Sequence, residues 1–365
     1  MKLEDRYWIM YKAAFKHIDL TDYEKAEIAE LYGDEGRNKI VARAKKKKII
    51  PATAMLMCKL GIDNEYWKSI SDEYRARNES LVEILDEVYS ALRANGVTKM
   101  GVVENFGALL ASGQDLAMFG SGDVDSYADI TEKDRIYNVF NNMGYALDEH
   151  CAGRILVSTS FKNENVLPKG CYLSINWDVT CRMHLPCLTA KGPFVDWNNS
   201  RTYKNTSILI PPPEALMYIC MMHIAVHGFC KAPDIRLYYD VANADDGGMD
   251  WSLIEKWAVR DEMCVRISTA AFLSNRLLGV DMTDRILNLG NSKVKAKLLS
   301  IVYHARGNRL KELPNRLGKL RIESLSNDRG GLHGLICVLI PDSEWVERNY
   351  GSKTLGYFLH LKNLI

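Results

Sequence analysis

The spacing of apolar residues changes twice along this 365-residue chain, and the change limits the folds it can adopt. Over residues 1–95, in segments such as TDYEKAEIAELYG, apolar residues recur every three or four positions, which predicts helices. Between residues 96 and 210, short strand-like runs alternate with helical ones, and from residue 211 to 365 the helical spacing returns. The sequence therefore predicts an α+β protein whose mixed core is flanked by an N-terminal and a C-terminal helical region.

Composition indicates an ordinary globular protein. Hydrophobic residues make up 47% of the chain, and the net charge of +1 weighs against a dominant surface for long nucleic acids. The basic run at residues 45–48 is typical of a solvated helix end. The nine cysteines include no CxxC pair, which is typical of reduced thiols, and no apolar stretch approaches the length of a membrane span. We therefore expect a cytoplasmic protein with no membrane partner.

The segment FGSGDVDSYAD places two aspartates, Asp123 and Asp125, directly after a glycine-rich turn. On a strand these side chains share one face, so their charges repel and a divalent cation would relieve the repulsion. The preceding residues read as strand, glycine and helix, which is the order of a nucleotidyltransferase core. In that chemistry Asp123 and Asp125 hold Mg²⁺ or Mn²⁺, while Gly107, Ser121 and Gly122 flank the phosphates of a nucleoside triphosphate (NTP).

Several segments resemble, in the same order, the uncharacterised nucleotidyltransferases of bacteria, which share the DNA polymerase beta-like catalytic fold. FGALLA (106–111) is similar to the Lys-Gly-x-x-Leu-Ala turn of that family, and GDVD (122–125) to its Gly-Asp-hydrophobic-Asp strand. The later segment 221–244 resembles its His-rich helix followed by Arg-x-x-x-Asp, and LIPDSEWVERNYG (339–351) its C-terminal stretch. The resemblance implies a mixed sheet with helices and the transfer of a nucleoside monophosphate from an NTP to an acceptor hydroxyl.

The chain departs from the family pattern at three places. Phe106 and Phe119 stand where the family commonly has a lysine and an arginine. In LSINWDV, Ser174 and Asn176 stand at the acidic and histidine positions of the next metal-ligand strand. Asp178 shares a strand face with these two residues and is the candidate third carboxylate if the register shifts, or else a polar residue in a solvated turn.

His223 and His227 are four residues apart in a predicted helix, a spacing that also suits a metal site. Ile224 occupies the position of the general-base glutamate in the HExxH signature, so two ordinary helix histidines are the competing interpretation. The resemblance implies that both histidines line the substrate cleft together with Arg236 and Asp240. Arg236 and Asp240 could equally form an intrahelical ion pair.

Two functions of different classes follow. The first is a metal-dependent nucleotidyltransferase that uses an NTP and the hydroxyl of a small molecule, sugar, peptide or protein. The second is a catalytically degenerate protein of the same fold that binds a nucleotide or a partner, and a zinc hydrolase built on the two histidines is a distant third.

Overall fold

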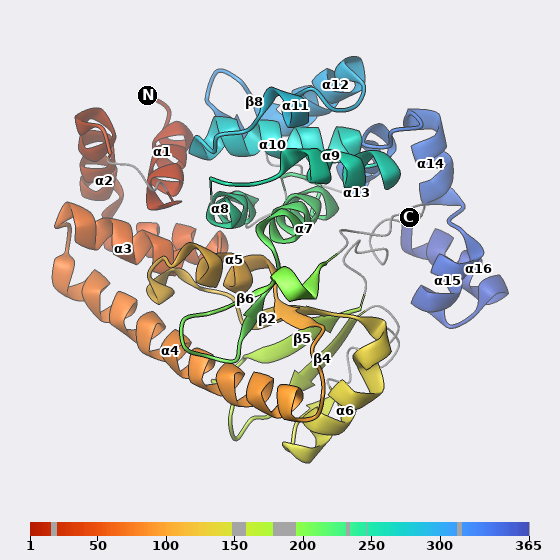
Figure 1. The fold of residues 1–365 in the computed structure, drawn as a ribbon. Coiled ribbons are helices and arrows are strands. Elements are labelled where there is room, and N and C mark those ends of the chain that lie inside the picture. The colour runs from red at the N-terminus through yellow and green to blue at the C-terminus, as the bar shows by residue number, and fades with distance from the viewer. Residues whose placement is uncertain are drawn as a thin grey trace.

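The computed structural model describes residues 1–15, 20–147, 158–177, 195–230, 234–245, 247–311 and 316–364 (Figure 1). The N-terminal helices are α1 (Leu3–Phe15), α2 (Asp22–Lys46), α3 (Ile50–Leu60) and α4 (Asn64–Ala94). The middle region contains α5 (Glu104–Ser112), α6 (Lys133–Asn142), the short helices η1 (Leu116–Met118), η2 (Ile130–Glu132) and η4 (Trp197–Asn199), and the strands β1 (Met100–Val102), β2 (Asp123–Ala128), β3 (Ala146–Leu147), β4 (Ser158–Lys162), β5 (Tyr172–Asn176), β6 (Arg201–Thr202) and β7 (Leu209–Ile210). The C-terminal elements are α7 (Pro213–Val226), α8 (Asp234–Ala244), α9 (Trp251–Arg260), α10 (Cys264–Leu278), α11 (Asp284–Leu287), α12 (Ser292–Val302), β8 (Tyr303–His304), β9 (Arg309–Leu310), α13 (Arg316–Leu325), α14 (Gly331–Leu339), α15 (Ser343–Tyr350) and α16 (Lys353–Leu364).

Local signals explain where several helices begin and end. A capping box starts α2. The Thr21 side chain accepts from the Glu24 N–H, and the Glu24 carboxylate accepts from the Thr21 N–H. Gly61 ends α3 in the left-handed conformation, and Pro213 occupies the first turn of α7. Helices dominate both terminal regions and strands are concentrated in the middle, which confirms the mixed α and β architecture. The exact domain boundaries stay a prediction.

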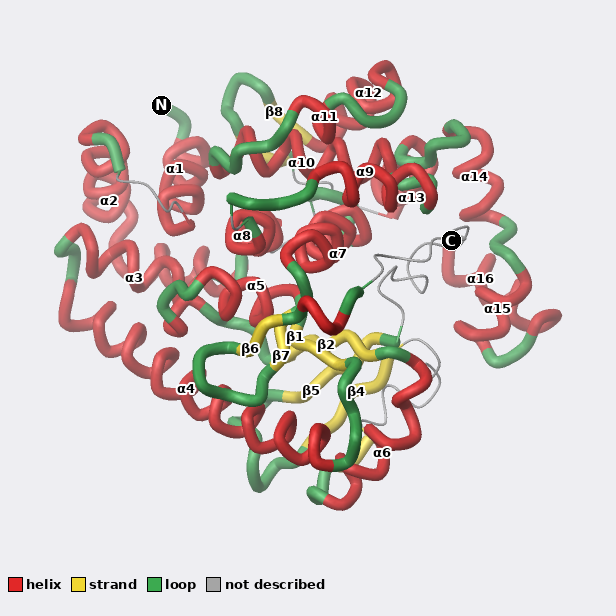
Figure 2. The backbone as a smooth tube through the Cα atoms, viewed as in Figure 1, coloured by secondary structure: helices red, strands yellow, loops and turns green. Residues whose placement is uncertain are grey.

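The middle region forms a five-stranded mixed sheet in the order β1-β2-β5-β4-β3 (Figure 2). β2 runs parallel to β5, whereas β1 pairs with β2, β4 with β5 and β3 with β4 in the antiparallel sense. The register of the parallel pair sets Asp125 opposite Ser174. Because side chains alternate along a strand, Asp123 and Asp125 point to one face, and Val124 and Ser126 point to the other.

Helices α4 and α6 cover the face that the aspartates do not use. The Tyr89 hydroxyl of α4 lies 3.0 Å from the Ser126 hydroxyl of β2, and the Tyr137 hydroxyl of α6 lies 2.8 Å from the Thr159 hydroxyl of β4. Both strand hydroxyls therefore have partners on this closed side of the sheet, and the aspartate face is left for other elements.

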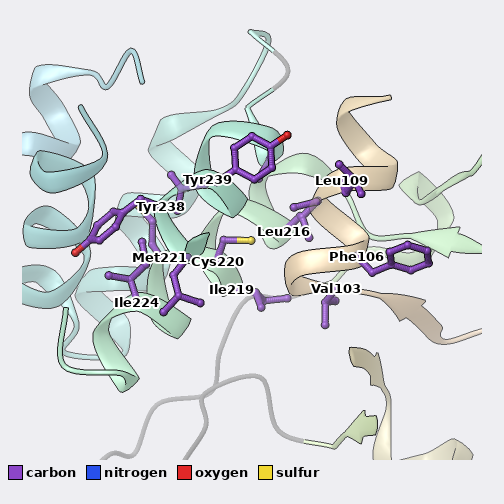
Figure 3. Packing of buried hydrophobic residues seen from close by; sticks show 14 of the residues in the cluster. Val103, Phe106, Leu109, Leu216, Ile219, Cys220, Met221, Ile224, Tyr238 and Tyr239 are labelled. Atoms are coloured by element: carbon purple, nitrogen blue, oxygen red, sulfur yellow. The ribbon is translucent and has the colours of Figure 1, made fainter. Parts of the chain in front are cut away.

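Helix α5 packs against β2 and against α7 and α8. In the close view of this core, Leu109 of α5 lies beside Leu216 of α7, and Val103, which precedes α5, lies beside Ile219 (Figure 3). All four side chains are buried. This apolar packing fixes α7 and α8 close to the strand that carries the two aspartates.

The cysteines correct one expectation. Among the residues that the structure describes, five cysteines are free, namely Cys58, Cys171, Cys220, Cys230 and Cys264. Cys337, by contrast, is disulfide-bonded. The expectation of reduced thiols is therefore wrong for Cys337.

Within the described ranges, no helix combines the length and the apolar character that crossing a bilayer requires. The long helix α4, for example, carries charged residues throughout its 31 positions.

Gly107 lies inside the first turns of α5 rather than in a turn before the helix, which corrects the expected placement. A Cβ atom at this position would lie 2.5 Å from the carbonyl oxygen of Val102 and 2.7 Å from the carbonyl carbon of Val102. The glycine is therefore required by the close approach of α5 to the end of β1.

We expect Gly107→Ala to lower the free energy of unfolding by about 1 to 3 kcal/mol, because the added methyl group meets backbone that cannot move away freely. Urea unfolding measures the change. Gly33→Ala in α2 is the matched control, since nothing lies within 4 Å of its Cβ position, and alanine there should stabilise the helix by about 0.5 to 1 kcal/mol. Equal effects of the two substitutions would contradict the packing argument.

Candidate functional site

Asp123 and Asp125 lie at the beginning of β2, and both residues are half-buried. The Ser121 hydroxyl donates a short hydrogen bond to Asp123. Burial raises the pKa of Asp125 well above its usual range, and the charges of Glu104 and Asp123 raise it further. Negative charge is thus crowded at this end of the strand, a condition that favours either a proton or a cation.

Two groups lower the pKa of Asp125. The Arg236 guanidinium and a side-chain hydrogen bond from Asn176 both lower the pKa of Asp125. Asn176 lies on β5, and Arg236 on α8, so the groups that stabilise this carboxylate come from elements far apart in the sequence.

Glu104 is a further carboxylate that lies at the junction of β1 and α5. Its backbone has a φ of 53°, in the left-handed region that a residue with a side chain seldom adopts, and the side chain is buried. The preceding residue is tied to β2, because the Val103 N–H donates to the Asp125 carbonyl at 2.8 Å. Backbone strain of this kind is typical of functional sites.

Glu104 pairs with His223 of α7. Its Oε2 lies 2.9 Å from the Nδ1 atom of His223, and both side chains are largely buried. Burial lowers the pKa of His223, but Glu104 and Asp240 outweigh it, so the pKa of His223 is raised. The His227 ring follows just past the end of α7, 4.6 Å from the His223 ring between centroids. The pairing leaves Nε2 as the ring atom of His223 that can serve a ligand.

Asp240 of α8 is buried, with 3% of its surface exposed. Burial is the main cause that raises its pKa to about 7, while Arg236 and His223 act to lower it. The Asn105 side-chain amide, with its nitrogen turned toward the carboxylate, donates to Oδ2 at 2.7 Å and to Oδ1 at 3.1 Å. Arg236 forms no ion pair with Asp240 among the described contacts, so the intrahelical pair considered from the sequence is wrong.

The position expected for a third strand carboxylate is occupied by a hydroxyl. Ser174 lies directly opposite Asp125, and its hydroxyl lies 2.9 Å from that of Ser160 on β4. Asp178 lies outside the described residues. Among the residues that are described, no three His, Cys, Asp or Glu side chains group closely enough to hold a metal ion by themselves. A zinc site made of protein ligands alone therefore has no support in the described part of the chain.

The glycine-rich turn before β2 is fixed by packing and by helix α4. A Cβ atom on Gly122 would lie 2.6 Å from the Gly170 carbonyl oxygen, which explains why this position is glycine. Arg77 donates to the Ser121 carbonyl at 2.8 Å, and Asn78 donates to the Phe119 carbonyl at 2.9 Å. The turn that leads into Asp123 is therefore held by side chains of α4.

Phe106 and Phe119, the two residues that replace basic residues of the family pattern, contact each other. Their ring centroids lie 4.5 Å apart at an interplanar angle of 45°, and both side chains are buried. Two separate departures seen in the sequence thus form one apolar contact, which contributes packing in place of positive charge.

Comparison with known families assigns the chain. The profile of a family described as uncharacterised nucleotidyltransferase matches residues 35–279, which span the interval from α2 to the end of α10. The protein belongs to this family. Searches of curated proteins and of solved structures found no match.

Sequence reasoning proposed Asp123, Asp125, His223, Arg236 and Asp240 as site residues. It did not include two polar residues whose contacts link them to this group. Glu104 and Asn105 follow β1 directly, and polar residues at the end of a strand, just before a helix, are a recognisable signal of a site. No local signal could have paired Glu104 with His223, because these residues are more than a hundred positions apart.

The raised pKa of Asp240 predicts a pH-dependent stability. Because the folded state holds this proton more tightly than the unfolded chain, the stabilisation is present below about pH 4 and is lost as the pH rises toward about 7. Asp240→Asn removes this dependence. Between about pH 5 and about pH 8, the free energy of unfolding of the variant should therefore rise by roughly 2 to 3 kcal/mol relative to that of the wild type.

Urea unfolding at the two pH values, with a chelator present, measures this difference. Asp281→Asn, at an exposed loop position, is the control and should follow the wild type. A constant offset between Asp240→Asn and the wild type at both pH values would show that Asp240 does not hold a proton at neutral pH.

Proposed function

We propose that this protein is a Mg²⁺-dependent nucleotidyltransferase that moves a nucleoside monophosphate from an NTP to an acceptor hydroxyl. The observation that carries the proposal is the Asp123 and Asp125 pair on one face of β2, where α5 packs and where the charge of Glu104 also acts on Asp125. Membership of the nucleotidyltransferase family supports the same reaction class.

The donor set fits a hard divalent cation. Mg²⁺ prefers a few carboxylates and completes its coordination with water and substrate phosphates. Asp123 and Asp125 would hold it. Burial raises the pKa of Asp125, the charges of Glu104 and Asp123 raise it further, and a cation would offset these charges. When bound, the cation would neutralise charge on the triphosphate and activate the attacking oxygen.

His223 is the candidate general base. The Glu104 carboxylate lies 2.9 Å from Nδ1 of the imidazole, and its charge increases the basicity of the ring. The acceptor hydroxyl gives its proton to Nε2 of His223 as its oxygen forms a bond to the α-phosphorus. The bond from that phosphorus to the bridging oxygen breaks, and pyrophosphate leaves with the electron pair. Glu104 thus takes the role of a third acidic group by acting through His223.

The acceptor is proposed only as a class, the hydroxyl of a small molecule, sugar, peptide or protein. Near-neutral net charge, +1, supports acceptors of this kind over long nucleic acids.

A second function, nucleotide or partner binding without turnover, is favoured by a specific pair of observations. The Phe106 and Phe119 contact removes charge that the family pattern places beside the substrate, and Ser174 bonds to Ser160 where an acid was expected. Pyrophosphate release in an acceptor screen separates the two functions, because only the transferase releases it.

We expect NTP binding to require Mg²⁺ and to weaken at least about tenfold in the Asp123→Asn, Asp125→Asn double variant, because the cation that bridges protein and phosphates is lost. Isothermal titration with each NTP, with and without Mg²⁺, measures both effects. Asp281→Asn is the control and should bind as the wild type does. Metal-independent NTP binding that survives in the double variant would contradict the proposed site.

A further inference from the structure

Arg236 is a partly buried cation whose donors are unused. Its Nε atom is inaccessible to solvent and has no hydrogen-bond partner, and the guanidinium makes no hydrogen bond or ion pair within the described part of the chain. Native proteins seldom leave a buried donor such as this Nε–H without an acceptor, and the guanidinium carries further N–H donors in the same plane. The arrangement indicates a missing acceptor.

The surroundings of Arg236 indicate where that acceptor would be. Its charge acts on Asp125 at the strand and on Asp240 of its own helix. Asp240 accepts from the Asn105 amide, and no hydrogen bond or ion pair joins Asp240 to Arg236 among the described contacts. The donors of Arg236 therefore remain available to a ligand beside the aspartate pair.

The family pattern supplies basic residues at two positions that are aromatic in this chain. Phe106 and Phe119 pack on each other, 4.5 Å apart between ring centroids, so neither position can contact phosphate through a charge. An NTP carries several negative charges, and the metal neutralises only part of them. Arg236, whose positive charge acts on Asp125, can neutralise part of the remainder.

We propose that Arg236 binds the phosphate chain of the NTP. This inference rests on the proposed function. The ligand group is a phosphate with two oxygens free to accept the guanidinium fork, as in the β- or γ-phosphate of an NTP or in tripolyphosphate.

The competing role for Arg236 is to balance the charge of Asp125 and Asp240. The two roles predict opposite effects of Arg236→Gln on different ligands. If Arg236 only balances charge, its removal leaves the aspartates more negative, so both free metal and metal-bound NTP bind at least as well as before. If Arg236 binds phosphate, free metal binds as well or better while NTP and tripolyphosphate bind worse.

The experiment compares the wild type with Arg236→Gln, Arg236→Lys and the surface control Arg285→Gln, all as the full chain. Mn²⁺ binding is measured by electron paramagnetic resonance. Binding of the tightest of the four NTPs, of tripolyphosphate and of the matching nucleoside is measured by isothermal titration with Mg²⁺. We expect Arg236→Gln to weaken the binding of NTP and of tripolyphosphate at least about tenfold. The binding of Mn²⁺ and of the nucleoside should be as tight as in the wild type or tighter. Arg236→Lys should be intermediate because it keeps the charge but lacks the fork.

Unchanged NTP and tripolyphosphate affinity in Arg236→Gln would overturn the inference, and so would an equal loss of every ligand or the unfolding of both Arg236 variants. Failure of the proposed function is distinguishable from this. If the wild type binds tripolyphosphate but no NTP, the transferase proposal fails. The arginine site is then still supported if Arg236→Gln binds tripolyphosphate more weakly than the wild type does. If the wild type binds neither, both proposals are overturned.

Discussion

Crowded negative charge is the constraint on which the site depends. The charge of Glu104 acts on Asp125, which Asp123 also affects, and on Asp240 of α8. Carboxylates in so enclosed a place are costly unless they share protons, pair with cations or bind metal. Burial is the main cause that raises the pKa values of Asp125 and Asp240. The charge of Arg236 lowers both, and that of His223 lowers the pKa of Asp240.

The enclosure is made by apolar packing. Helices α4 and α6 close one face of the sheet, and α5 holds α7 and α8 against the other (Figure 1). Gly107 lets α5 approach β1 closely, and the approach fixes Glu104 in its strained conformation beside the Asp125 backbone. Hydrophobic burial across this core therefore provides the free energy that holds charged groups in an arrangement they would not adopt in water.

Much of the fold and part of the site could be read from the sequence. The change in apolar periodicity predicted helical ends around a mixed core, and the alternation of a strand predicted a shared face for Asp123 and Asp125. The relation between Arg236 and Asp240 could not be predicted, because their helical spacing permits an ion pair but does not show whether one forms. The Asn105 amide, brought in from α5, took the Asp240 carboxylate instead. Likewise, the sequence indicated two separate losses of charge at Phe106 and Phe119, and only the fold shows that the two rings contact each other.

The sequence by itself determined the class of elements, the glycine positions and the two aspartates, because these follow from local periodicity and steric limits that act within a few residues. The tertiary structure alone decided which charges meet. Glu104 pairs with His223, and Asn176 supports Asp125, only because the sheet and the helices bring distant segments within hydrogen-bonding range. Electrostatic and hydrogen-bond energies depend on distances through space, and these distances exist only once the core has packed.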